Sequence, residues 1–145
     1  MDGKQLRRLK PELESFLERY LGLFEGSLPA LEVGPQGCRL LSIRPARPHP
    51  QVVGTTLHYT QGGVELRSEQ WDAEARTLTV ELALPGEHRG SVFVATGNDY
   101  DPAGATGEGV VYRPACRCAV ASLTLKGAAR VVFQMNPAAG KPKPF

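Results

Sequence analysis

Residues 48–72 read PHPQVVGTTLHYTQGGVELRSEQWD, and the interpretation of the whole chain starts from them. Short runs of valine, leucine and threonine alternate there with glycine and proline, a composition typical of strands separated by turns. We expect strands at residues 52–59 and 64–71. Three prolines at positions 45, 48 and 50 cannot donate to a strand ladder, so an extended, unpaired passage should precede the first of these strands.

Similar alternations continue on both sides of this stretch. The clearest is at residues 77–82, where Leu78, Val80 and Leu82 fall on one face of a half-buried strand. Turn residues predict hairpins at 72–76 and 126–129, and a long glycine-rich loop at 97–109. The remaining strands are expected at residues 38–44, 77–84, 91–95, 110–112, 118–126 and 130–135. Leu123 and Leu125 should share one face of the strand at 118–126. The predicted fold is all-β, an antiparallel β-sandwich of about eight strands of Greek-key type.

An amphipathic helix is expected over residues 1–26, before the β-domain. Its apolar side chains recur every three or four residues. The helix should pack on the β-domain, although a docking face for a partner or a DNA-binding element remains an alternative. Residues 27–36 are a linker, 37–136 the β-sandwich domain and 137–145 a loose tail. The apolar stripe consists of Leu6, Leu9, Leu13, Phe16, Leu17, Tyr20 and Phe24.

The composition bounds the function. The chain of 145 residues has room for one domain, and its formal charge of +2 argues against a nucleic-acid partner. There is no apolar run long enough to span a membrane and no secretory signal, so the chain as written is expected in the cytoplasm. Cys38, Cys116 and Cys118 form neither a disulfide framework nor a zinc motif, and we expect them to be small, semi-buried apolar residues.

Two pairs of carboxylates are close enough in sequence to consider for catalysis. Glycoside hydrolysis needs two such groups across the scissile bond. Asp72 and Glu74 fall in a predicted hairpin, where Asp is a common turn residue, and Asp99 and Asp101 fall in the glycine-rich loop. Asp99, Asp101 and Glu108 could alternatively bind calcium, but their spacing fits no EF-hand. We therefore predict no catalytic site, no metal site and no cofactor.

The aromatic residues raise the possibility of carbohydrate contact, because sugar faces stack on exposed rings. Trp71 and Tyr59 are the candidate contacts, with Tyr100 and Tyr112 nearby in the pattern. The alternative for Trp71 is a place in the core, since a Trp in a strand buries a large area. His49 and His58 have no Cys or His partners nearby, and His58 is expected to be a hydrogen-bonded interior or strand residue.

One part of the sequence resembles a known family. Residues 37–45, GCRLLSIRP, followed by residues 49–63, HPQVVGTTLHYTQGG, resemble the C-terminal β-sandwich domain of α-galactosidase-like (melibiase) glycoside hydrolases. The resemblance covers about residues 31–135. In that family a catalytic barrel lies upstream, and no residue here matches its catalytic carboxylates. Residues 6–17 also resemble the opening helix of certain transposases.

The resemblance implies a fold but no activity. We expect a non-catalytic accessory domain of glycoside-hydrolase type, with a structural or interaction role, whose partner would be a glycoside-hydrolase catalytic domain. The expected N-terminal helix would cover the apolar face that such a domain turns to its barrel. The alternative is a carbohydrate-binding module that uses Trp71 and Tyr59. Fold-level analogy alone does not choose between the two.

Overall fold

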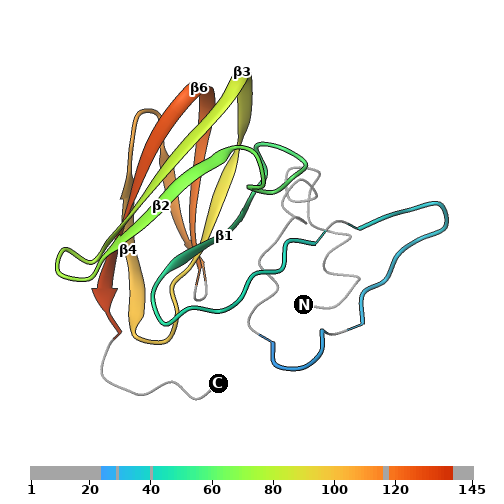
Figure 1. Cartoon of the computed structure of the whole chain (residues 1–145), viewed down its shortest axis with the longest axis horizontal. Helices are drawn as coiled ribbons and strands as arrows, with labels where there is room; N and C mark the ends of the chain where they lie inside the picture. Colours follow the sequence, from blue (N-terminus) through green and yellow to red (C-terminus); the bar gives the residue numbers. More distant parts are fainter. Residues whose placement is uncertain (1–23, 29, 40, 116–117, 139–145) are drawn as a thin grey trace.

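A computed structural model of the chain describes residues 24–28, 30–39, 41–115 and 118–138 (Figure 1). These residues contain no helix and form a single antiparallel sheet, so the prediction of an all-β antiparallel fold is confirmed. Its six strands are β1 (Gln51–Thr55), β2 (Leu66–Asp72), β3 (Thr77–Ala95), β4 (Tyr100–Thr106), β5 (Val111–Ala115) and β6 (Cys118–Pro137).

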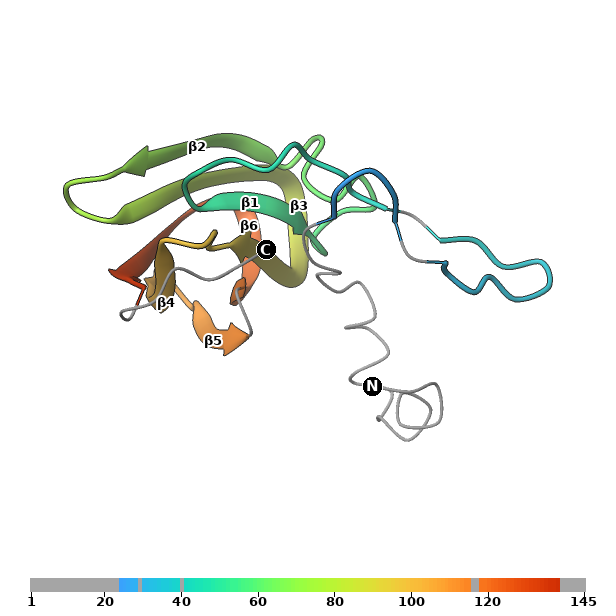
Figure 2. The same cartoon turned by 90° about the horizontal axis from the view of Figure 1, so that it is seen from below.

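The sheet is built on two long strands, β3 and β6, which pair along nearly their whole length. The four shorter strands attach to this ribbon near its two ends. β2 and β4 flank the half that contains the start of β3 and the end of β6, whereas β1 and β5 flank the other half. Figure 2 shows the resulting sheet curling into half a barrel.

The curl is produced by a bend in the middle of the ribbon. Leu84 pairs with Gly127 and Glu87 pairs with Lys126, so that Pro85 and Gly86 are extra residues without partners. Proline has no N–H to offer a ladder, and a bulge of this kind bends a strand and increases its twist. Gly86 and Gly127 have φ angles of 90° and 79°, which glycine adopts without the steric cost of a Cβ atom.

The inner side of the curl holds the hydrophobic core. The expected alternation at residues 77–82 is confirmed, because Leu78, Val80 and Leu82 are buried while the residues between them are half-buried. Leu123 and Leu125 are also buried, as expected. Both halves of the ribbon contribute, and the cluster consists of Val52, Leu57, Leu78, Val80, Leu82, Leu84, Val92, Val94, Ala119, Ala121, Leu123, Leu125, Val131, Phe133 and Met135.

A second, smaller apolar cluster lies apart from this core. Phe93, Cys118 and Val120 are buried together, with Val53 packed against them. Burial raises the pKa of the Cys118 thiol to about 12. The expectation of a buried apolar cysteine therefore holds for Cys118, whereas Cys38 is exposed and Cys116 lies outside the described residues.

Two predicted strand breaks are wrong. The hairpin expected at residues 126–129 does not exist, because the chain does not reverse there and continues through a bend as the single strand β6. Likewise, the strands expected at 77–84 and 91–95 are one strand, β3. Glycine at a positive φ serves a bulge as well as a turn, so the local sequence does not reveal whether the chain reverses. The hairpin at residues 72–76 is confirmed.

Other predicted elements also differ from the structure. In the described part of residues 38–44 there is no strand, and β1 ends at Thr55 instead of residue 59. The glycine-rich loop expected at 97–109 contains β4, which pairs with the far end of β6. The eight-stranded Greek-key sandwich is therefore not confirmed. Except for residues 24–26, the predicted N-terminal helix lies outside the described residues, as does all but the start of the predicted tail at 137–145.

Replacing Gly127 with Ala should destabilise the fold by about 1–2 kcal/mol, the cost of a Cβ atom in a left-handed backbone conformation. No atom lies near the position of that Cβ, so backbone strain is the whole effect. Gly104→Ala is the matched control, because its site is equally open and its φ is not positive. Urea unfolding should give a lower midpoint for Gly127→Ala alone, and equal midpoints for both variants would contradict the role of the bend.

Candidate ligand-contact site

A buried carboxylate organises the loop between β1 and β2. Glu65 has no solvent exposure, and Thr55, Thr60, Gly62 and Val64 donate hydrogen bonds to its carboxylate. Its Oε2 accepts a 2.7 Å hydrogen bond from Thr55 Oγ1. Its Oε1 accepts from Thr60 Oγ1 at 2.9 Å and from the backbone N of Gly62 at 2.8 Å. A buried carboxylate is tolerable only when such donors replace water.

These donors keep Glu65 ionised. Burial alone would raise the pKa of its carboxyl group, but hydrogen bonds from Thr55, Thr60 and the backbone, including the N–H of Gly62, together outweigh burial and lower it. Hydrogen bonds from hydroxyl and amide groups of the same loop thus stabilise the negative charge of the carboxylate.

Further contacts fix the loop to the sheet. Leu57 is buried in the main core. The backbone N of Thr56 donates to the carbonyl of Ser91 at 2.9 Å, and the N–H of Ser91 returns a 2.8 Å bond to Thr56 Oγ1. At the other end, the backbone N of Ala83 donates to the carbonyl of Glu65 at 2.9 Å. The loop is therefore anchored to β3 at both ends.

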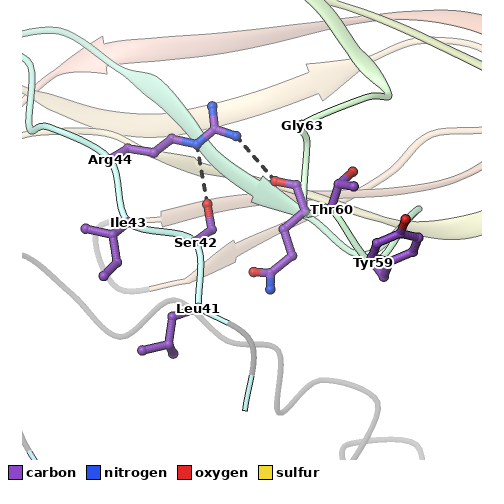
Figure 3. Close-up of a pocket in the computed structure, with 8 residues that line it drawn as sticks. Leu41, Ser42, Ile43, Arg44, Tyr59, Thr60 and Gly63 are labelled. Carbon is purple, nitrogen blue, oxygen red and sulfur yellow. Dashed lines mark hydrogen bonds between the residues drawn. The ribbon is translucent and has the colours of Figure 1, made fainter. Parts of the chain in front are cut away.

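The anchored loop presents Tyr59 to solvent. Tyr59 is 76% exposed, and its ring centroid lies 4.3 Å from that of His58. His58 is half-buried and its Nδ1 lies 2.9 Å from Thr60 Oγ1, so it is hydrogen-bonded as expected, but in a turn instead of a strand. Tyr59 lines a shallow depression of about 500 Å³ (Figure 3). The remaining lining residues are Leu41, Ser42, Ile43, Arg44, Thr60, Gln61 and Gly63.

Arg44 is held in this depression by two hydrogen bonds. Its Nη2 donates to the carbonyl of Gln61 at 3.3 Å, and its Nε lies 3.4 Å from Ser42 Oγ. Ser42 Oγ in turn donates to the carbonyl of Val53 in β1 at 2.9 Å. The segment at residues 42–44 is thereby tied both to the sheet and to the loop that carries Tyr59.

Trp71 lies at a different place. It is half-buried at the end of β2 and packs against the main core. His49 stacks on it at a centroid distance of 6.3 Å and an interplanar angle of 5°, and Tyr100 meets it edge-on at 4.9 Å. Trp71 also borders a second hollow, which Tyr59 does not line. The structure therefore does not bring the two predicted sugar contacts into one site, and their role as contacts stays a prediction.

The aspartates considered for catalysis or calcium binding take part in a turn and in backbone pairing. Asp72 is a turn residue, because its Oδ1 accepts hydrogen bonds from the backbone N of Glu74 at 2.9 Å and of Ala75 at 3.0 Å. The carbonyl of Asp99 accepts a bond from the backbone N of Ala138, and Asp101 pairs with Asn136 within the sheet. Within the described ranges, no cluster of three or more His, Cys, Asp or Glu side chains could hold a metal ion.

Sequence reasoning missed the two charged residues that matter most for the site. The sequence predicts only that Glu65 lies in the strand at 64–71, and that Arg44 ends the strand at 38–44 and belongs to the stretch that resembles the melibiase family. The available signal was the Thr-Gln-Gly-Gly run that precedes Glu65, since hydroxyl and glycine N–H groups in a tight turn are natural partners for a carboxylate.

No family model matches the chain, and no curated protein or solved structure matches it either. In the part of the chain that the structure describes, we find no helix that is both long and apolar enough to cross a membrane.

Replacing Glu65 with Gln should destabilise the protein by about 1–3 kcal/mol. The amide of Gln has an NH2 group in place of one carboxylate oxygen, so a buried donor that bonds to that oxygen would lose its acceptor. Glu74→Gln is the control, since its side chain is exposed. Chemical unfolding of both variants measures the difference. An unchanged free energy of unfolding for Glu65→Gln would show that the carboxylate does not hold the loop.

The pH dependence of stability should report the same group. The folded pKa of Glu65 lies below its ordinary value of 4.5, so its contribution is fully present above that value and is lost as the pH falls through the folded pKa. The pKa of Glu81 is also lowered, by its hydrogen bond with Arg130, and acts in the same direction. Unfolding measured from about pH 7 to pH 3 should show the gap between wild type and Glu65→Gln narrowing with acid. A constant gap would argue against an ionised Glu65.

Proposed function

We propose that this chain is a non-catalytic accessory β-domain that binds carbohydrate through Tyr59. The observation that carries the proposal is an aromatic ring that is 76% exposed on a loop anchored by a buried carboxylate. An exposed ring on a fixed loop is a ready platform for a sugar face, because little conformational entropy is lost on binding. Arg44 lines the same depression, and the N–H groups of a guanidinium can donate to sugar hydroxyl groups.

The proposal includes a family origin. The resemblance of residues 37–63 to the accessory domain of melibiase-type glycoside hydrolases supports it, together with the antiparallel all-β fold. In the curled sheet each half of the β3–β6 ribbon is flanked by two short strands, which gives two four-stranded halves around one core. We propose that this is a bent relative of the eight-stranded sandwich, with an N-terminal helix that ends before residue 24.

A second candidate is an accessory domain that only docks on a glycoside-hydrolase catalytic domain. It is favoured by Ile43, which is 72% exposed, and by Leu41 beside it, because apolar side chains gathered at one place on a surface are typical of protein interfaces. Stable folding without any glycan binding would favour this candidate.

Tyr59→Ala should weaken glycan binding at least about tenfold, about 1.4 kcal/mol, while leaving stability within about 0.5 kcal/mol because the side chain is exposed. A glycan array followed by calorimetry on the best ligand measures the affinity. Tyr59→Phe is the matched control and should retain most of the binding, since it keeps the ring.

Glycan binding by Trp71→Ala should also be measured, because Trp71 is the other aromatic residue predicted to contact a sugar. Because Trp71 packs against the core, this substitution should lower stability. Binding that survives Tyr59→Ala but is lost in a folded Trp71→Ala variant would move the carbohydrate site to Trp71.

A further inference from the structure

Arg44 is a half-buried cation without a carboxylate partner among the described residues. The ion pairs found there join Arg47 to Glu69 and Arg130 to Glu81. Arg44 instead bonds to a carbonyl and a hydroxyl, both uncharged. A guanidinium group in a depression with neutral partners remains available to an anionic ligand.

The geometry leaves part of the guanidinium group open. A guanidinium has five N–H donors, and the contacts to Gln61 and Ser42 use two of them. Figure 3 shows the remaining nitrogen of Arg44 directed away from both of these contacts. The group is therefore fixed on one side and free to pair with a ligand on the other.

The loop is shaped to admit this guanidinium group. A Cβ atom on Gly62 would lie 2.8 Å from Arg44 Nη2, closer than such atoms approach. Gly62 also has a φ of 105°, which a side chain would strain. The backbone N of Gly62 meanwhile donates to Glu65, so the buried carboxylate that fixes the loop also fixes the surface under Arg44.

The charge of the depression is of one sign. Of its lining residues, Arg44 alone carries a formal charge. Glu65 is not part of this lining: its carboxylate is buried and accepts hydrogen bonds from the hydroxyl and backbone donors of its own loop. The depression is thus suited to an anion next to an aromatic ring.

We infer that the ligand is an acidic oligosaccharide, in which the carboxylate of a uronate residue pairs with Arg44 while another ring of the chain stacks on Tyr59. This inference rests on the proposed carbohydrate-binding function and names its ligand class. Figure 3 shows Arg44 and Tyr59 on opposite sides of the depression, which favours a chain of sugar rings over a single one. The flat carboxylate of a uronate matches the fork of a guanidinium group.

The first test uses the wild-type protein and two ligands with the same sugar chain, one with ionised carboxylates and the other with neutral methyl esters. Tetragalacturonate should bind at least tenfold more tightly than its fully methyl-esterified form, as measured by isothermal titration calorimetry at low ionic strength. Added inorganic phosphate at the same ionic strength as a chloride control should not displace it. Equal affinity for the two forms would overturn the role of the charge, and displacement by phosphate would indicate an unspecific anion site.

The second test assigns the charge to Arg44. Arg44→Gln should remove the preference for the acid form, while Arg89→Gln, which removes an exposed arginine of β3, should preserve it. Arg44→Lys should give an intermediate preference, because lysine keeps the charge but lacks the fork. A preference unchanged in Arg44→Gln would overturn the inference.

The outcomes separate this inference from the proposed function. Binding of the neutral ester that depends on Tyr59 but not on Arg44 would leave the carbohydrate module standing and refute the acidic ligand. No binding of acidic or neutral glycans would refute both. If Arg44→Gln does not fold, the comparison of the two ligands on the wild-type protein still decides the question.

Discussion

The continuous pairing of β3 with β6 is the constraint on which the rest of the structure depends. These strands have 19 and 20 residues, and each shorter strand pairs with one of them. A flat ribbon of this length would leave one apolar face open to water. The bend at Pro85, Gly86 and Gly127 turns that face inward, so that both halves of the ribbon bury their side chains in one core.

The candidate site depends on the fold through Glu65. Its backbone carbonyl bonds to β3, and its carboxylate gathers the hydroxyl and amide donors of the loop. Burying a charge is costly, and here hydrogen bonds within a short segment outweigh the effect of burial on the pKa of the Glu65 carboxyl group. The result is a loop with adjacent glycines that is nevertheless fixed, and a fixed loop would lose little entropy on binding the proposed ligand at Tyr59.

The sequence predicts the inner faces of the strands well and their connections poorly. Leu78, Val80 and Leu82 alternate with polar residues, and that period follows directly from strand geometry. In contrast, Gly127 carries the same local signal for a hairpin as for a bulge, and the choice is made by the distant partner strand. The strand β4 is likewise determined by a distant partner. Its sequence has a weak strand propensity by itself, and it forms a strand because it pairs with the edge of β6.

The candidate site shows the same division between local and distant information. Composition identifies Tyr59 and Trp71 as the aromatic candidates, but exposure is decided by neighbours that the sequence does not place beside them. His49 and Tyr100 enclose Trp71, whereas Tyr59 projects from a turn that Glu65 holds from beneath. Arg44 enters the depression from a segment without strand structure, through bonds to a carbonyl and a hydroxyl that leave no trace in sequence patterning. In the proposed complex the ligand would meet this positive charge, whose partners in the protein are uncharged, and charge would then be the property by which the site best discriminates.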